Sequence, residues 1–195
     1  TVTSESTQGT TGAFRAVNNV NFQGSLVNEE DGVFAGAQNG VYFGTGDHSG
    51  GSFVNRGTVT SDSRAVNIDG DGLTVVNEGQ ILGTGDQRNG TVYVDGTGDQ
   101  YTFTNAGVVD AGLGNNGSAL SIQNGDVDGD IVSAAVFNTG LLQGQGDASE
   151  GNTVGDGLRV FSNAEDTGFA GIIQNEGTIA GSEDSDVAAG IRIDG

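Results

Sequence analysis

The chain of 195 residues contains no cysteine, proline, methionine, tryptophan or lysine. Without cysteine there is no disulfide framework and no thiolate metal site. The longest apolar runs are far shorter than the roughly 20 residues that a membrane-spanning helix needs. A disulfide scaffold is therefore excluded, and we expect no membrane insertion.

Positive charge is scarce. All six basic residues are arginines, and against 26 carboxylates they leave a formal net charge of -20. Nucleic acid and anionic membrane surfaces would be repelled by such a chain, so we expect neither as a partner. The polar residues are mainly Asp, Asn, Ser, Thr and Gly, a pattern typical of exported proteins, which predicts an extracellular location.

Glycine is abundant, with 37 residues, and the apolar residues are not scattered among them. They form short runs of Val, Ile, Leu and Phe, separated by clusters of Gly, Asp, Asn and Ser. High charge and much glycine can indicate disorder, but this pattern indicates many short strands joined by turns.

A short motif repeats along the chain: an Asn, any residue, a Gly and then an aliphatic residue two places on. Successive copies lie 22 to 37 residues apart, and the first corner is looser than the others, with three residues between Asn and Gly. The repeated asparagines are Asn28, Asn55, Asn77, Asn105, Asn138 and Asn175. Self-similarity at this period is the signature of a repeat architecture.

Each repeat holds three apolar segments in a constant order. The middle segment alternates strictly, so its residues point to opposite faces of a strand. The apolar face comprises Val41, Phe43, Val66, Ile68, Val92, Val94, Leu120, Ile122, Leu158, Val160, Ile191 and Ile193. The opposite face, which we expect to meet water, comprises Tyr42, Asn67, Tyr93, Ser121, Arg159 and Arg192.

Three one-sided strands cannot bury their apolar faces alone, but stacked repeats can. The sequence therefore predicts an all-β fold, a right-handed parallel β-helix (β-solenoid) of roughly triangular section, with three short strands per coil and six to seven coils. We expect residues 1–195 to form a single solenoid segment. Because the chain opens and closes on incomplete coils, we expect it to belong to a longer array.

The Asn-x-Gly corner has a structural interpretation. Asn77 shares the inward face with Val75, so the six asparagines are expected to stack as a buried amide ladder in which each satisfies its neighbours. Gly79 is expected to supply the backbone freedom of a tight bend.

Acidic, glycine-rich loops form a second group of candidates. Closely spaced carboxylates let several oxygens face one point, as calcium requires. The candidate calcium ligands are Asp47, Asp69, Asp71, Asp86, Asp95, Asp99, Asp126, Asp128 and Asp130. The alternative is that these residues only form turns. The stretch from Asp126 to Asp130 begins like an EF-hand loop, but the twelfth position is Phe137 and not Glu.

Signals for catalysis are weak. The only histidine, His48, lies in a glycine-rich loop, has no second histidine or cysteine to act with, and is expected to be a solvated loop residue. Polysaccharide-cleaving β-helices need paired carboxylates, basic residues and aromatic platforms in one cleft. Here the outward residues are scattered, and no outward row of the middle strands is rich in threonine, which disfavours ice binding. We expect no enzyme.

The repeat resembles the β-helical passenger regions of autotransporters and very large surface adhesins of Gram-negative bacteria. The likeness lies in the core Asn-x-Gly-x-Ile/Val, at Asn55 to Val59, Asn77 to Ile81 and Asn175 to Ile179. It implies the solenoid architecture more than any one function, because such helices serve as spacers, adhesins and fibre subunits.

The sequence thus favours an extracellular structural protein of a bacterial surface or biofilm matrix. We expect a rigid acidic rod, with calcium in its loops and self-association with neighbouring copies in a fibre or array. The alternatives are an adhesin that binds a host receptor or surface glycan through its variable loops, and a polysaccharide-binding or polysaccharide-degrading β-helix.

Overall fold

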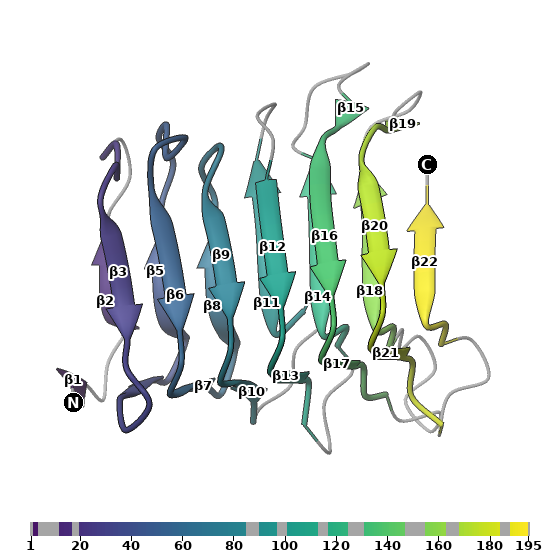
Figure 1. The fold of residues 1–195 in the computed structure, drawn as a ribbon, viewed down its shortest axis with the longest axis horizontal. Coiled ribbons are helices and arrows are strands. Elements are labelled where there is room, and N and C mark those ends of the chain that lie inside the picture. Colours follow the sequence, from purple (N-terminus) through teal and green to yellow (C-terminus); the bar gives the residue numbers. More distant parts are fainter. Residues whose placement is uncertain are drawn as a thin grey trace.

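A computed structural model describes residues 2–3, 12–16, 20–84, 90–96, 101–112, 117–124, 131–146, 155–162, 168–183 and 188–194. The regular elements of these residues are all β-strands, and they stack side by side along one axis (Figure 1). No helix long and apolar enough to span a membrane occurs in these ranges.

Three parallel sheets run the length of the stack. Sheet 1 contains β1 (Val2–Thr3), β4 (Val33–Gly36), β7 (Thr58–Ser61), β10 (Gln80–Gly83), β13 (Val108–Asp110), β17 (Leu141–Gln143) and β21 (Thr178–Ala180). Sheet 2 contains β2 (Gly12–Ala16), β5 (Asn39–Phe43), β8 (Arg64–Ile68), β11 (Val92–Gly96), β14 (Leu120–Asn124), β18 (Leu158–Ser162) and β22 (Ile191–Asp194). Sheet 3 contains β3 (Ser25–Asn28), β6 (Ser52–Asn55), β9 (Thr74–Asn77), β12 (Tyr101–Asn105), β16 (Ala134–Asn138) and β20 (Ile172–Asn175).

Each strand pairs with its counterpart one repeat away, and the register follows the repeat. In sheet 3, for example, Val54 pairs with Val76 and Asn55 with Asn77. A further two-stranded pair, β15 (Ile131–Val132) with β19 (Gly168–Phe169), extends two of the later coils. The fold is therefore a parallel β-solenoid of six to seven coils, as the repeat predicts.

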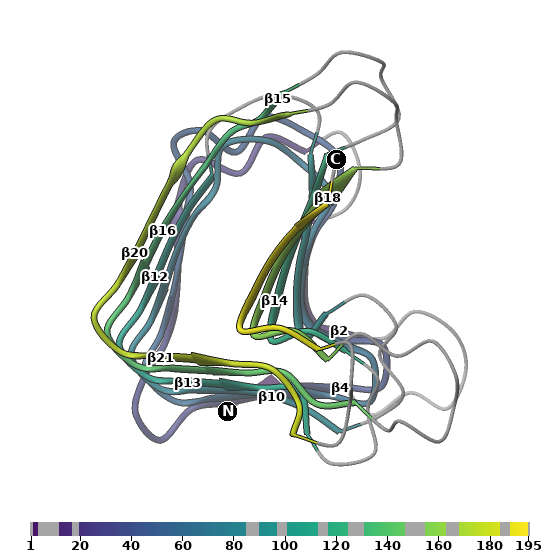
Figure 2. The same ribbon diagram turned by 90° about the vertical axis from the view of Figure 1, so that its right-hand side faces the viewer.

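The view along the axis gives the hand of the coil. In Figure 2 the C-terminal end faces the viewer, and the chain passes from β13 at the bottom to β14 on the right, β15 at the top and β16 on the left. This path is anticlockwise and advances toward the viewer. The solenoid is right-handed, as parallel crossover connections almost always are.

The inward faces of the three sheets form one continuous core. Phe43, Phe53, Ile68, Ile81 and Leu120 are fully buried in it. Burying each such side chain contributes about 1.5–3 kcal/mol. The faces assigned from alternation are thus confirmed in the central coils, while Ile191 and Ile193 of β22 point the same way but remain 44% and 54% exposed.

The outer face of sheet 2 departs from the prediction that it meets water. Asn67, Tyr93 and Ser121 are only 5%, 3% and 0% exposed. One reason is that side chains of one coil cover those of the next, because the Arg64 guanidinium stacks on the Tyr93 ring at 3.7 Å from its centroid.

A second reason is the shape of the section, which is not a simple triangle. Figure 2 shows sheet 2 leaning inward where it follows sheet 1. The first residues of its strands pack closely on sheet 1: a β-carbon on Gly40 would lie 2.6 Å from Val59 Cγ1.

Candidate functional site

The Asn-x-Gly corner forms the predicted amide ladder between sheets 3 and 1. In each step the Nδ2 of one asparagine donates to the Oδ1 of the next. The steps are Asn28 to Asn55 at 2.8 Å, Asn55 to Asn77 at 2.8 Å, Asn77 to Asn105 at 2.7 Å, Asn105 to Asn138 at 2.8 Å and Asn138 to Asn175 at 2.7 Å.

The ladder asparagines also bind the backbone of the next coil. Asn55 Nδ2 donates to Gln80 O at 3.0 Å and Asn77 Nδ2 to Val108 O at 3.2 Å. Asn55, Asn77 and Asn105 are fully buried, so their amide groups are satisfied within the protein and are not available to a ligand. The ladder is a structural element.

The corner glycines serve a different purpose from the one expected. Positive φ angles occur at other glycines of the described residues, and Gly79 is not among them. A β-carbon there would instead lie 2.2 Å from Gly57 O of the preceding coil. Glycine is needed because the corners of successive coils lie too close together for any side chain.

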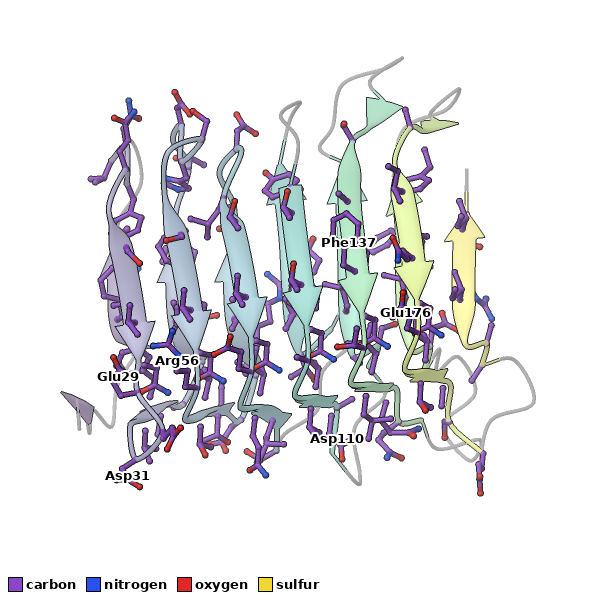
Figure 3. The ribbon with its side chains drawn as sticks, viewed as in Figure 1. Glu29, Asp31, Arg56, Asp110, Phe137 and Glu176 are labelled. Atoms are coloured by element: carbon purple, nitrogen blue, oxygen red, sulfur yellow. The ribbon has the colours of Figure 1, made fainter. Side chains whose placement is uncertain are left out.

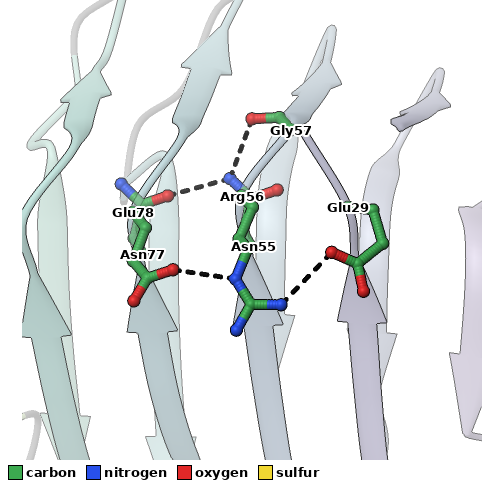
Figure 4. Close-up of polar contacts among 6 residues, drawn as sticks. All are labelled: Glu29, Asn55, Arg56, Gly57, Asn77 and Glu78. Carbon is green, nitrogen blue, oxygen red and sulfur yellow. Dashed lines mark hydrogen bonds and ion pairs between the residues drawn. The ribbon is translucent and has the colours of Figure 1, made fainter. Parts of the chain in front are cut away.

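Charged residues occupy the variable position in three of the five Asn-x-Gly corners, and Ala106 and Thr139 occupy it in the other two. Arg56 lies between Glu29 and Glu78, with Nη1 at 3.2 Å from Glu29 Oε2 and Nε at 2.9 Å from Glu78 Oε2 (Figure 4). Figure 3 shows Glu176 at the equivalent corner of a later coil. These pairs are solvent-exposed, so they add little to stability.

Two candidate calcium ligands lie on neighbouring turns between sheets 2 and 3. Asp47 and Asp71 form a parallel backbone bridge. Asp47 Oδ1 accepts a hydrogen bond from Ser49 N at 2.9 Å, and contacts with Ser49 lower the pKa of this carboxyl. The Asp71 carboxylate lies 3.5 Å from the Tyr101 hydroxyl.

The carboxylates of Asp69 and Asp95 contact tyrosines. Burial, followed by a hydrogen bond to Asp69, raises the pKa of Tyr42 to about 12. The Tyr93 hydroxyl donates to Asp95 Oδ2 at 3.3 Å. Each of these aspartates therefore has a partner within the protein.

Within the described ranges, no three His, Asp or Glu side chains come together as a metal-binding group would require. The remaining candidate ligands, Asp86, Asp99, Asp126, Asp128 and Asp130, lie outside the described residues. The calcium prediction therefore stays a prediction.

His48 is buried, and the prediction of a solvated loop residue is wrong. Its side chain is 0% exposed. Nδ1 accepts a hydrogen bond from Phe22 N at 3.1 Å, and Nε2 lies 2.8 Å from Gly44 O, which requires a proton on Nε2. The ring also contacts Phe43 edge-on. His48 thus ties a turn to the preceding coil.

The outer face of sheet 2 gathers most of the positive charge. Arg15, Arg64, Arg159 and Arg192 all lie on its strands, and Arg56 is the one other arginine that the structure describes. Three guanidinium groups stack on aromatic rings: Arg15 on Tyr42, Arg64 on Tyr93, and Arg159 on Phe161. Sequence reasoning identified part of this row but missed Arg15, Arg64 and Phe161. Arg64 is brought in by its contact with Tyr93 of the next coil, whereas Phe161 lies two residues after Arg159 on the same strand, so strict alternation could have identified it.

Carboxylates accompany these arginines in the last coils. Arg159 Nη2 lies 3.2 Å from Asp194 Oδ2, and Arg192 Nε lies 3.1 Å from Asp156 Oδ2. Asp156 is fully buried and its Oδ1 accepts a hydrogen bond from Ala189 N at 2.7 Å. Burial raises the pKa of Asp156, although the Ala189 N–H and Arg192 oppose the rise.

A face that combines aromatic rings, guanidinium groups and carboxylates is suited to binding sugars. The apolar face of a sugar stacks on a ring, and its hydroxyl groups form hydrogen bonds with planar polar groups. Tyr42, Arg159 and Arg192 are accessible, whereas the Tyr93 hydroxyl bonds to Gln123 within the layer. The accessible part of the face therefore lies toward the two ends of the sheet.

Comparisons with known protein families, with curated proteins and with solved structures found no match.

Proposed function

We propose that the chain is a non-enzymatic structural protein, a rigid acidic rod or spacer that works outside the cell, on a bacterial surface or in a biofilm matrix. One observation carries this proposal: each complete coil repeats the same three strands in register, and the buried amide ladder joins the coils along the axis. A stack of this kind gains stability from each added coil and sets a fixed length per repeat.

The likeness of the Asn-x-Gly corner to autotransporter passengers and large adhesins supports the same proposal. In such a role, neighbouring coils or copies associate in a fibre or array. A net charge of -20 also suits a secreted rod, because strong like charge opposes nonspecific aggregation.

The proposed location is tested by labelling intact and permeabilised source cells with antibodies raised against the chain. Label on intact cells or in the surrounding matrix supports the proposal. Label that appears only after permeabilisation contradicts it.

Calcium binding is the second part of the proposal. Asp47 and Asp71 lie on adjacent turns, and the sequence holds similar acidic, glycine-rich stretches in other repeats. Bound calcium would neutralise carboxylates and stabilise the folded state. We expect the melting temperature to rise in millimolar calcium relative to a chelator, with equimolar magnesium as control. If the melting temperature is the same in calcium and in chelator, these loops are only turns and bind no calcium.

Glycan binding is the alternative function, and the stacked arginines and rings of sheet 2 favour it. A surface adhesin would use this face together with the variable turns that flank it. The test is binding of neutral and acidic polysaccharides to the chain and to the variants Arg159→Ala and Tyr42→Ala. Weaker binding by both variants, with an unchanged fold, would favour the adhesin over the spacer.

A further inference from the structure

Sheet 3 carries no charge in a chain of net charge -20. Its strands read SLVN, SFVN, TVVN, YTFTN, AAVFN and IIQN, without any Asp, Glu, Arg or His. In sheet 1, by comparison, β13 contains Asp110, and sheet 2 contains arginines and aspartates. Figure 1 looks directly onto the outer face of sheet 3.

The outward residues of sheet 3 form two rows along the rod axis. One row is Ser25, Ser52, Thr74, Thr102, Ala135 and Ile172, and the other is Val27, Val54, Val76, Thr104, Phe137 and Gln174. None of the twelve is buried, and Figure 3 shows Phe137 on this face. The second row is mainly apolar, and the first is mainly small and hydroxylated.

No described segment covers this face. Figure 2 shows sheet 3 as the outermost layer on its side of the section. The carboxylates of Glu29, Glu78 and Glu176 lie at the corner beyond the ends of the strands. Arg56 pairs with Glu29 and Glu78 at this corner, so the charge-free face is a flat strip bordered there by more carboxylates than cations.

We propose that two copies of the chain associate laterally, with the outer face of sheet 3 of one copy packed on that of the other. The proposal rests on the structural role above and names the surface through which rods pair. The occupant is a second copy because two strongly acidic rods repel one another wherever carboxylates meet. The charge-free strip is where their surfaces approach with the least repulsion.

The size of the strip sets the strength of pairing. Strands about 4.8 Å apart and about 13 Å long give six coils a face of roughly 300–400 Å². A stable interface needs about 800 Å² per partner. Pairing of this chain should therefore be weak and reversible, and it should strengthen as more coils extend the same strip.

Packed sheets lie about 10 Å apart, which allows the mainly apolar rows of two copies, those that begin at Val27, to interdigitate. The acidic corners of both copies then face one another across the edges of the interface. Their repulsion extends over a Debye length of about 10 Å at 0.1 M salt but only about 3 Å at 1 M. Monovalent salt should therefore promote pairing, the opposite of its effect on a contact made by salt bridges.

The test is sedimentation equilibrium of the whole chain over a concentration series, in chelator, at 0.05 M and 1 M NaCl. We expect a monomer–dimer equilibrium whose association constant is at least about tenfold larger at the higher salt. A chain that stays monomeric at millimolar concentration in 1 M NaCl would overturn the proposal, and so would association that chelator abolishes.

Variants locate the surface. Val54→Asp with Val76→Asp places two charges on adjacent strands of sheet 3, and Thr60→Asp with Leu82→Asp does the same on the outer face of sheet 1. The first pair should weaken association at least about tenfold, which is 1.4 kcal/mol, and the second pair should leave it within about twofold. Equal effects of both pairs would contradict the proposal.

A third variant distinguishes the effect of a charge placed on the sheet 3 surface from the effect of the chain's net charge. Val54→Lys with Val76→Lys makes the chain less acidic, so pairing should improve if only net charge matters. We expect pairing to be lost, because a charge then enters the interface unpaired. If antibodies label the protein outside the cell but the chain does not pair, this inference is wrong and the proposed role stands. If the chain pairs but antibodies label it only inside cells, the proposed role is wrong and this inference stands.

Discussion

At the residue scale, the asparagine ladder is the feature that couples one coil to the next. Every buried member donates to the next asparagine and to a backbone carbonyl of the following coil. Removing one amide therefore leaves unsatisfied polar groups on both sides, and a buried unsatisfied group costs about 1–3 kcal/mol.

Asn77→Ala should lower the free energy of unfolding by about 2–4 kcal/mol. Its matched control is Asn175→Ala, because Asn175 is exposed, accepts one ladder bond from Asn138 and donates to the nearby Gly177 O, so this substitution removes one ladder bond and not two. Chemical denaturation of both variants measures the difference. If the two substitutions cost the same, the ladder does not couple the coils.

His48 is the second residue whose role depends on a neighbouring coil. His48→Ala removes the acceptor for Phe22 N and leaves a cavity beside Phe43. We expect a loss of about 2–4 kcal/mol in unfolding free energy, because a buried hydrogen bond and packing are lost together. Amide exchange at Phe22 should accelerate more than exchange in the central coils. Unchanged protection at Phe22 would contradict the assigned hydrogen bond.

Alkaline titration tests the tyrosine contacts on sheet 2. Burial and Asp69 raise the pKa of Tyr42 to about 12, and burial and Asp95 raise that of Tyr93 as well. Both tyrosines bind their protons more tightly in the folded chain than in the unfolded chain, where the pKa is about 10. The contribution of these two tyrosines to stability should therefore be constant below pH 10 and fall above it as the unfolded state ionises.

Absorbance of the phenolate follows this titration cleanly, because the chain has three tyrosines and no tryptophan. Asp69→Asn should move the Tyr42 transition to lower pH and leave that of Tyr93 nearly in place. A native titration in which all three tyrosines ionise near pH 10 would show that these contacts are absent.

At the element scale, the corner between sheets 3 and 1 is fixed in length by backbone contact. Gly107→Ala would place a β-carbon 2.0 Å from Gly79 O, whereas the nearest atom to a β-carbon on Gly50 is 3.6 Å away. We expect a cost of about 1–3 kcal/mol for Gly107→Ala and almost none for Gly50→Ala. Thermal unfolding compares the two; similar melting temperatures would mean that the corners are not tightly stacked.

The strands and their inward faces could be predicted because period-two alternation and the Asn-x-Gly spacing are both local and repeated. Val66 and Ile68, for example, are buried as their pattern indicates. The exposure of Tyr93 and His48 was not predictable in the same way. Both are covered by residues far away in the sequence, Arg64 and Phe22, whose approach depends on how individual turns fold back.

The candidate site likewise has a part that the sequence predicts and a part that it does not. Periodicity identified the ladder because it involves one residue type at one position of every coil. The partners of Asp69, Asp95 and Asp156 are individual contacts that do not recur from coil to coil, and a repeat pattern carries no information about these. The strand pair β15 and β19 likewise belongs to only two coils.

At the scale of the whole molecule, the distribution of charge follows the three sheets. Sheet 3 is neutral, sheet 2 holds arginines beside carboxylates, and most of the carboxylates that the structure describes lie in turns and corners. In the proposed lateral pairing, the neutral face of sheet 3 is the surface through which two rods meet. The length of each rod follows directly from the number of coils, at about 4.8 Å each.

Electron cryo-microscopy of the protein in its native setting tests the proposed structural role most directly. We expect unbranched rods, single or laterally paired, with a layer line at about 4.8 Å along the axis from the stacked strands. Compact particles without axial repeat would contradict the account.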